Sequence, residues 1–391
     1  MITPPLRFRM ESKAFYDYWQ YEDGSRLLQK LDSIPDLSLA TAQVPLLYEK
    51  DDLADKVIAD CFIDRPFPAT MQLMSEYASG VQPANTAPQS VQDLLGQMHT
   101  LPVWLDKALM RTGTEVCARS GKSGLIVLRN YSLMLGYQSA AINKPLIATG
   151  ALHKGAVKRI ADTTDFWYEV TGTDALQPGS IGFMHCFKTR LIHAYSRVMI
   201  KRNLEWSVAE QGEPLNHWDM LATYLGFSLV FLEGVRKLGF TISDAEANGV
   251  YHLWKYIGHL IGIPHQILPD NDPQAITRLY LWSKTQPEAD SNSIALAQAL
   301  HLESMQAAWP PLQWQKKTIQ RINLGFNYHL IGRRSCEVLH LPKSVFRYFI
   351  KMAIAVNTID DAIAIRSAGY RRYLIAKGRR EQETIRNNVK R

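Results

Sequence analysis

The chain has 391 residues, of which 46% are hydrophobic and 21% are charged. This length can bury one large core or two moderate ones, and the composition is ordinary for a globular protein, which excludes a fibrous fold and general disorder. The net charge of +7 is concentrated near the end of the chain, because residues 366–391 hold nine Lys or Arg and only two Glu.

We expect a cytoplasmic protein without a targeting segment. Residues 1–16 lack the apolar run of a secretory signal. The longest apolar stretch, 221–232, is followed at once by Glu233, Arg236 and Lys237, so a buried helix explains it better than a membrane span. The four cysteines are far apart and form no CxxC pair, which excludes a zinc framework and a disulfide scaffold.

Helical periodicity runs along most of the chain and alternating strand patterns are scarce, so we predict an all-α fold. A short helix starts at Ser90, and longer helices cover 180–203 and 219–238. Ser243 is the N-cap of the next helix, because SDAE from that residue forms a capping box. Pro264 ends that helix near residue 262.

Proline pairs divide the rest of the chain. Residues 309–311 read WPP, and residues 341–342 read LP before a final helical region. We therefore divide the chain into an N-terminal helical extension (1–98), a central domain (99–345) and C-terminal helices with a basic tail (346–391).

Several familiar catalytic motifs are incomplete. Gly121-Lys122-Ser123 resembles the end of a phosphate-binding loop, but the glycine required five positions earlier is Val116, so we expect a solvated turn. A di-iron site needs two Glu-x-x-His motifs, and only 337–340 fits. HExxH and GxSxG are absent. His252 and His259 share a helix face, which packing explains as well as a metal does.

The strongest constellation is Arg190-Leu-Ile-His193-Ala-Tyr-Ser-Arg197. Spacings of three and four put the three polar side chains on one helix face over about two turns. Their neighbours are apolar, so the segment looks buried, and burying charge without a partner is costly. Something anionic should therefore meet the two arginines.

Haem satisfies the whole set. A neutral imidazole can bind the iron, and guanidinium groups one turn away can bind the two propionates. From the residues alone, an exposed basic face or a set of internal salt bridges fits the spacing as well, and is the more common case.

Ordered motifs around this constellation resemble the latex clearing protein group, within the family of rubber oxygenases and fungal MpaB-type oxygenases (domain of unknown function 2236). The motifs run in order over 101–342. They are LPVW from Leu101, SLMLGY from Ser132, TGAL from Thr149, RIADT from Arg159, the Arg190–His193–Arg197 set, GEPLNHWD from Gly212, WKYIGHLIG from Trp254 and LIG from Leu330.

The resemblance implies a globin-like helical core that binds one haem b. It also implies His193 as the proximal iron ligand, with Arg190 and Arg197 needed to retain the haem. Members of the family cleave carbon–carbon double bonds of polyisoprene with dioxygen, and the fungal members shorten an isoprenoid side chain.

The other side of the implied haem departs from the rubber cleavers. Arg159 and Thr163 match their pattern, but their lysine position reads Asp162 and their upstream acid aligns with Asn143. Asp162 either handles a water or proton near iron or pairs with Arg159 one turn away. Cys186 lies on the helix of His193, and we expect a packed thiol there.

The resulting prediction is a haem b-dependent oxygenase acting with dioxygen on a small apolar, possibly isoprenoid, substrate. Arg159, Asp162 and Thr163 are its candidate catalytic residues. Two alternatives stay open: a non-catalytic haem or lipid carrier, and a peroxidase-like enzyme. We expect no nucleic-acid partner, because no aromatic-basic motif accompanies the charge. The basic tail is either a solvated helix or a contact to anionic lipid.

Overall fold

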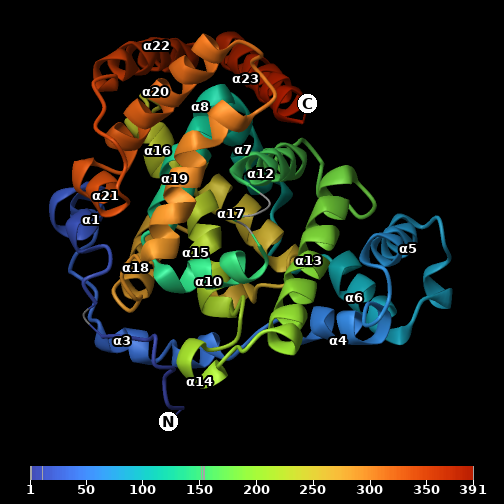
Figure 1. The fold of residues 1–391 in the computed structure, drawn as a ribbon. Helices are drawn as coiled ribbons and strands as arrows, with labels where there is room; N and C mark the ends of the chain where they lie inside the picture. Colours follow the sequence, from blue (N-terminus) through green and yellow to red (C-terminus); the bar gives the residue numbers. More distant parts are fainter. Residues whose placement is uncertain (1, 11, 151, 153–154, 391) are drawn as a thin grey trace.

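The computed structural model describes residues 2–10, 12–150, 152 and 155–390, with the backbone alone for residues 347–349 (Figure 1). Ala151 of the TGAL motif and the terminal Arg391 lie outside this part. Every regular element within it is a helix, which confirms the all-α prediction. None of the described helices combines the length and apolarity needed to cross a bilayer.

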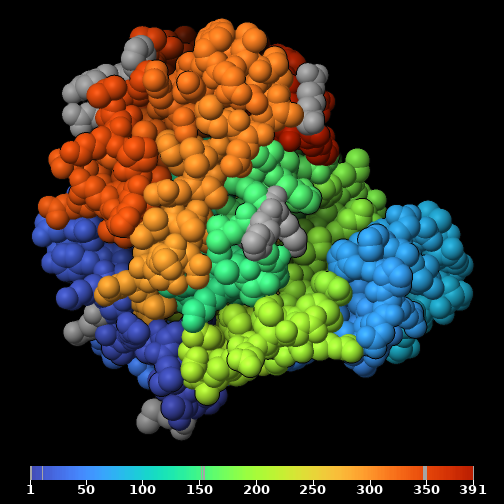
Figure 2. Space-filling model, in the orientation of Figure 1, coloured from blue at the N-terminus to red at the C-terminus, as the bar shows by residue number. Residues whose placement is uncertain are grey.

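The N-terminal segment (residues 1–99) wraps along the lower edge of the molecule in Figure 1 and ends in a lobe made of α4, α5 and α6, which projects to one side in Figure 2. Its helices are α1 (Tyr16–Tyr21), α2 (Asp23–Leu28), α3 (Ser38–Thr41), η1 (Val44–Leu47), α4 (Asp52–Cys61), α5 (Phe67–Ser79), η2 (Ala84–Thr86) and α6 (Gln89–His99).

The middle of the chain forms the core. Its helices are α7 (Lys107–Arg119), α8 (Gly121–Val127), the π-helical turn η3 (Leu128–Leu133), α9 (Met134–Gly136), α10 (Ala140–Ala148), α12 (Ala156–Val170), α13 (Ile181–Asn203), α14 (Val208–Gln211), α15 (His217–Phe227), α16 (Leu229–Lys237) and α17 (Asp244–Leu260). Helices α7 and α17 pack closely because two glycines meet: a Cβ on Gly113 would lie 2.2 Å from the Gly249 carbonyl oxygen.

The C-terminal part begins beside the core and ends with α20, α22 and α23, which cover one end of it, at the top of Figure 1. Its helices are η4 (His265–Ile267), α18 (Asp272–Ser283), α19 (Ser291–Gln306), α20 (Gln313–Leu330), α21 (Arg333–Val338), α22 (Arg347–Arg366) and α23 (Ala368–Val389).

Local sequence signals locate several helix ends correctly. Ser180 caps α13 by accepting from the Phe183 amide, and Ser243 and Glu246 form the expected capping box of α17. The single helix expected over 219–238 is wrong, because the chain breaks between α15 and α16. At Ser228 the backbone leaves the helical region (φ −111°, ψ −82°), and its hydroxyl donates to the Tyr224 carbonyl, a bond that competes with helix geometry.

Two expected surface features are packed instead. Gly121, predicted in a solvated turn, joins α7 directly to α8 with φ +51°, and a Cβ there would lie 3.1 Å from the Gly378 Cα of α23. The basic tail forms α23, which lies against α7, α8 and α12. Arg371 contacts Glu246 at 2.9 Å and Lys390 contacts Asp165 at 2.6 Å, so the body neutralises much of its charge.

Candidate functional site

The two arginines of α13 are buried and paired, but with carboxylates of this chain. Arg190 Nε donates to Asp51 Oδ2 at 2.6 Å, and its Nη2 donates to Gln97 Oε1 at 2.7 Å. Arg197 Nε donates to Asp55 Oδ1 at 2.8 Å, and its Nη1 to the Leu215 carbonyl at 3.0 Å. Anionic partners for both arginines are thus present within the chain, at the start of α4.

Asp51 and Asp55 were missed in the sequence although a local signal was present. Asp51 is the N-cap of α4, since it accepts from the Ala54 amide, and Asp55 lies one turn further on the same helix. Burial raises the pKa of Asp55, and the Arg197 guanidinium opposes that rise. An acid pair at four-residue spacing matches two arginines on a facing helix, but nothing local says which helices face each other.

His193 lies between the arginines and makes no hydrogen bond with the described residues. Its Nδ1 is buried without a partner. Burial, followed by the positive charge of Arg197, lowers the pKa of His193 to about 4. The ring is therefore neutral near pH 7, which is the form that binds metals.

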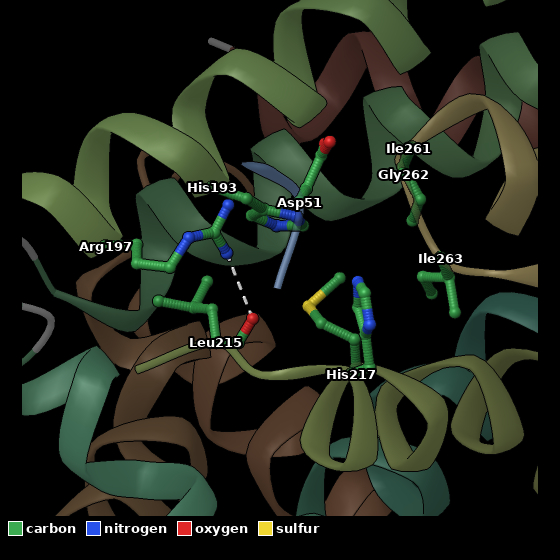
Figure 3. A pocket seen from close by; sticks show the side chains of 9 residues that line it. Asp51, His193, Arg197, Leu215, His217, Ile261, Gly262 and Ile263 are labelled. Carbon is green, nitrogen blue, oxygen red and sulfur yellow. Dashed lines mark hydrogen bonds between the residues drawn. The ribbon is translucent and has the colours of Figure 1, made fainter. Parts of the chain in front are cut away.

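The His193 ring faces a small hollow of about 10 Å³ (Figure 3). His193 and Arg197 reach it from α13, and His217 reaches it from the opposite side. Both His217 ring nitrogens are buried without a hydrogen bond, and burial lowers its pKa. The full lining is Asp51, His193, Arg197, Leu215, His217, Met220, Ile261, Gly262 and Ile263.

His217 belongs to the GEPLNHWD motif, but it was not among the site residues predicted above. Asn216 caps α15 by accepting from the Asp219 amide, and this fixes His217 at the first position of the helix. The hollow has a volume of about 10 Å³, room for about one water molecule, and is far smaller than the roughly 300–1,000 Å³ typical of ligand sites. A macrocycle needs much more room than it offers.

Arg159 on α12 is a buried guanidinium without a carboxylate partner. Its Nη2 donates to the Tyr137 hydroxyl, and its Cζ lies 5.2 Å from the centre of the Tyr137 ring. Its Nε and Nη1 are buried without any partner. Burial lowers the pKa of Arg159 to about 10, so it is still a cation at neutral pH. Such a group is suited to bind an anion.

Asp162 does not accompany Arg159. Its carboxylate lies 2.8 Å from Lys158 Nζ, and both side chains are about two-thirds exposed. Of its two expected roles, the pairing with Arg159 is therefore wrong. Thr163, one turn after Arg159, is half-buried. Asn143 is buried and donates to the Tyr137 carbonyl and to Ser293 Oγ, each at 3.0 Å, which ties α10 to α19.

The α12 and α13 motifs lie at the same level of two antiparallel helices. A Cβ on Gly182 would lie 2.7 Å from the Glu169 carbonyl, and His185 contacts Asp165 at 3.8 Å. Six residues before Asp165 on α12 the chain reaches Arg159, and eight residues after His185 on α13 it reaches His193. Each residue advances 1.5 Å along a helix, so the two distances along the helices are similar. Arg159 and His193 therefore lie at similar heights on neighbouring helices, but Arg159 is not among the residues that line the hollow at His193.

The other predicted histidines form a packed seam. The rings of His252 and His259 both contact Trp104, at 5.7 and 6.0 Å between centres. His252 Nε2 accepts from the Asp106 amide at 2.8 Å. Over the described residues there is no group of three or more His, Cys, Asp or Glu able to hold a metal ion. Cys186 is buried, as expected for a packed thiol.

Comparison with known proteins gives this geometry a context. The family described as "ER-bound oxygenase mpaB/B'/Rubber oxygenase, catalytic domain" matches residues 118–356. The chain belongs to this family. The match contains Arg159, His193 and the other predicted site residues, whereas Asp51, Asp55 and Gln97 lie before it.

Two relatives define the similarity further. A rubber oxygenase from Streptomyces sp. (strain K30) is 26% identical over 228 residues, which is 57% of this chain and 55% of that protein. The chain thus matches little more than half of that curated relative's length. The structure of latex clearing protein LCP in the closed state superposes with a TM-score of 0.60 at 17% identity, covering 85% of this chain and 91% of the other. That likeness shows a shared helical fold.

Proposed function

We propose that this member of the mpaB/rubber oxygenase family is a haem b-dependent oxygenase that acts with dioxygen on an apolar, isoprenoid-like substrate. The observation that carries the proposal is His193. Its imidazole is neutral, enclosed, without a hydrogen-bond partner and directed into a hollow between helices. A buried polar group without a partner is costly, so its retention points to a ligand.

The donor chemistry of the site fits haem. In the proposal His193 binds the iron, and haem supplies the redox chemistry of dioxygen. The ion pairs of Arg190 and Arg197 with Asp51 and Asp55 hold α13 against α4 and fix the direction of His193. Arg190 Nη1 is buried without a hydrogen-bond partner, so this arginine also has a donor for a haem propionate.

Arg159 supplies the unpaired cation. Its two free N–H groups are available to a carboxylate or to negative charge that develops during the reaction, and its burial strengthens that interaction. Thr163 lies on the same face of α12. Asp162 is paired with Lys158 at the surface, so the proposal assigns it no step.

The size of the hollow adds a requirement to this proposal. Because a hollow of about 10 Å³ cannot hold a porphyrin, loading must displace side chains or a segment around His193. Loaded and haem-free protein should then differ in their resistance to proteolysis near the hollow.

An absorption spectrum of the purified protein tests the proposal. We expect a Soret band in the wild type, its loss in His193→Ala, and its retention in the matched control His301→Ala on α19. A folded wild type that takes up no haem would refute the proposal. Oxygen consumption that depends on an added isoprenoid then distinguishes the oxygenase from a carrier with the same haem.

A further inference from the structure

Helix α22 is apolar on two opposite faces. Its inward face holds Ile350 and Ala364, which are 3% and 2% exposed, and Asn357, which donates to the Leu238 carbonyl. The opposite face, which we call the α22 stripe, consists of Met352, Val356, Ile359 and Ile363, exposed by 69%, 57%, 61% and 44%. The spacings of four, three and four place them along one line of the helix.

The α22 stripe is larger than a chance exposure of single apolar residues. The neighbouring helix α20, which packs against α22, also carries exposed apolar side chains at Trp314 (64%) and Ile322 (38%). Val345, just before α22, is 78% exposed. Contiguous apolar surface of this kind on a soluble domain marks an interaction site, and the question is what covers it.

Charge decides among the candidate partners. Residues 309–391 contain 17 Lys or Arg and five Asp or Glu, whereas residues 1–308 contain 27 and 32. Arg371, Lys377, Arg386 and Lys390 of α23 pair with carboxylates, so these side chains add little net charge. Arg366 at the end of α22 bonds only the Ala362 carbonyl, and Arg372 at the start of α23 is exposed without an ion pair to a described carboxylate. The end of α22 next to the stripe therefore keeps unpaired positive charge.

We propose that the α22 stripe docks on an anionic lipid bilayer, with α22 lying in the plane of the interface. Apolar side chains enter the acyl boundary, and the surrounding Lys and Arg meet the lipid phosphates. A second copy of the chain is a poorer partner, because the same cationic surfaces would face each other. Nucleic acid offers the negative charge but no cover for four aliphatic side chains.

This arrangement places the enzyme where apolar molecules accumulate. In Figure 1, α20, α22 and α23 occupy one end of the molecule, away from the N-terminus. Docking through α22 leaves the α13 hollow and the α4 lobe outside the contact. The inference therefore does not depend on haem, and its test uses no activity measurement.

The test is flotation of the full-length protein with vesicles of phosphatidylcholine, with and without phosphatidylglycerol. We expect binding to the vesicles that contain phosphatidylglycerol, weakened by high salt. The double variant Ile359→Gln/Ile363→Gln should bind at least tenfold more weakly. Burying each isoleucine in the bilayer contributes more binding free energy than the 1.4 kcal/mol that corresponds to a tenfold change. Ile34→Gln is the matched control, since Ile34 is 64% exposed, comparable with Ile359 at 61%, but lies near the N-terminus.

Two further measurements fix the interpretation. Arg366→Gln/Arg372→Gln should weaken binding to the anionic vesicles and leave the folded signal unchanged. If the wild type ignores both vesicle types, or the isoleucine variant floats as the wild type does, the membrane assignment is wrong. A dimer in sedimentation that is lost in the isoleucine variant would assign the stripe to a second copy and also overturn the proposal.

Discussion

At the scale of single residues, the site is built from groups that would each be unfavourable alone. Arg159 Nε and Nη1, His193 Nδ1 and both ring nitrogens of His217 are buried atoms without a hydrogen bond to a described residue. Leaving one such group unsatisfied costs about 1–3 kcal/mol. The meeting of His193 and His217 at one hollow therefore separates a ligand site from ordinary core packing more clearly than the Arg-x-x-His-x-x-x-Arg spacing does.

Titration of His259 gives a residue-scale prediction outside the proposed ligand set. Burial, then the charge of Arg190, lowers the pKa of His259 to about 4 from its usual 6.5. Between these values the unfolded chain binds more protons than the folded one, so stability falls as pH drops from 6.5 to 4. Allowing for partial solvent screening, this amounts to about 1–2 kcal/mol.

Urea unfolding of the wild type and His259→Phe at pH 7 and pH 4.5 measures this effect. Phenylalanine keeps the contact with Trp104 and removes the titration, so the variant should lose less stability than the wild type between the two pH values. Equal losses in the two proteins would mean that His259 is already protonated, or freely solvated, in the fold.

At the scale of helices, the sequence predicts what is decided locally. The N-caps Ser180 and Ser243 each bind an amide three residues ahead, so the helix starts follow from a few letters. The break at Ser228 is different, because Leu221 and Leu232 on the two sides are both fully buried and the apolar pattern continues through it. Tertiary packing decides there, and periodicity does not report it.

The α7–α17 contact yields a prediction for a helix pair. A Cβ on Gly113 would lie 2.2 Å from the Gly249 carbonyl oxygen, so Gly113→Ala must push the two backbones apart. We expect destabilisation by about 2–4 kcal/mol, in the range of overpacked cores. Gly96→Ala in α6 is the matched control.

A Cβ at Gly96 meets nothing within 4 Å, so its gain in helix propensity should stabilise the protein by about 0.5–1 kcal/mol. Thermal unfolding of the two variants compares them directly. If Gly113→Ala were as harmless as Gly96→Ala, the close approach of the two helices would not exist in solution.

At the scale of the whole molecule, the division into an N-terminal extension and a central domain leaves out the contacts that matter most. Arg190 and Arg197 could be recognised in the sequence because they lie on one helix. Their partners Asp51 and Asp55 could not, because 139 and 142 residues separate each pair. Arg7 likewise reaches Asp219 at 2.7 Å in a buried pair. The N-terminal segment thus completes a site whose family motifs all lie further along the chain.

This dependence predicts that the N-terminal segment is needed to hold α13 and His193 in place. In the full-length chain, Asp51→Asn/Asp55→Asn leaves two buried guanidinium groups without a carboxylate, and breaking one buried pair typically costs about 3–5 kcal/mol. We expect a large loss of unfolding free energy and, in the protein that stays folded, a weakened Soret band.

The surface pair provides the matched control, because Asp162→Asn removes an exposed partner of Lys158 and should change stability by less than about 1 kcal/mol. The two variants also separate charge from shape, since asparagine nearly preserves the volume of aspartate. Should the Asp51/Asp55 variant retain both wild-type stability and its full haem complement, ion pairing would not be what fixes α13. The N-terminal segment would then act on the site only by packing, that is, by the apolar contacts of α4 and α6 with the core.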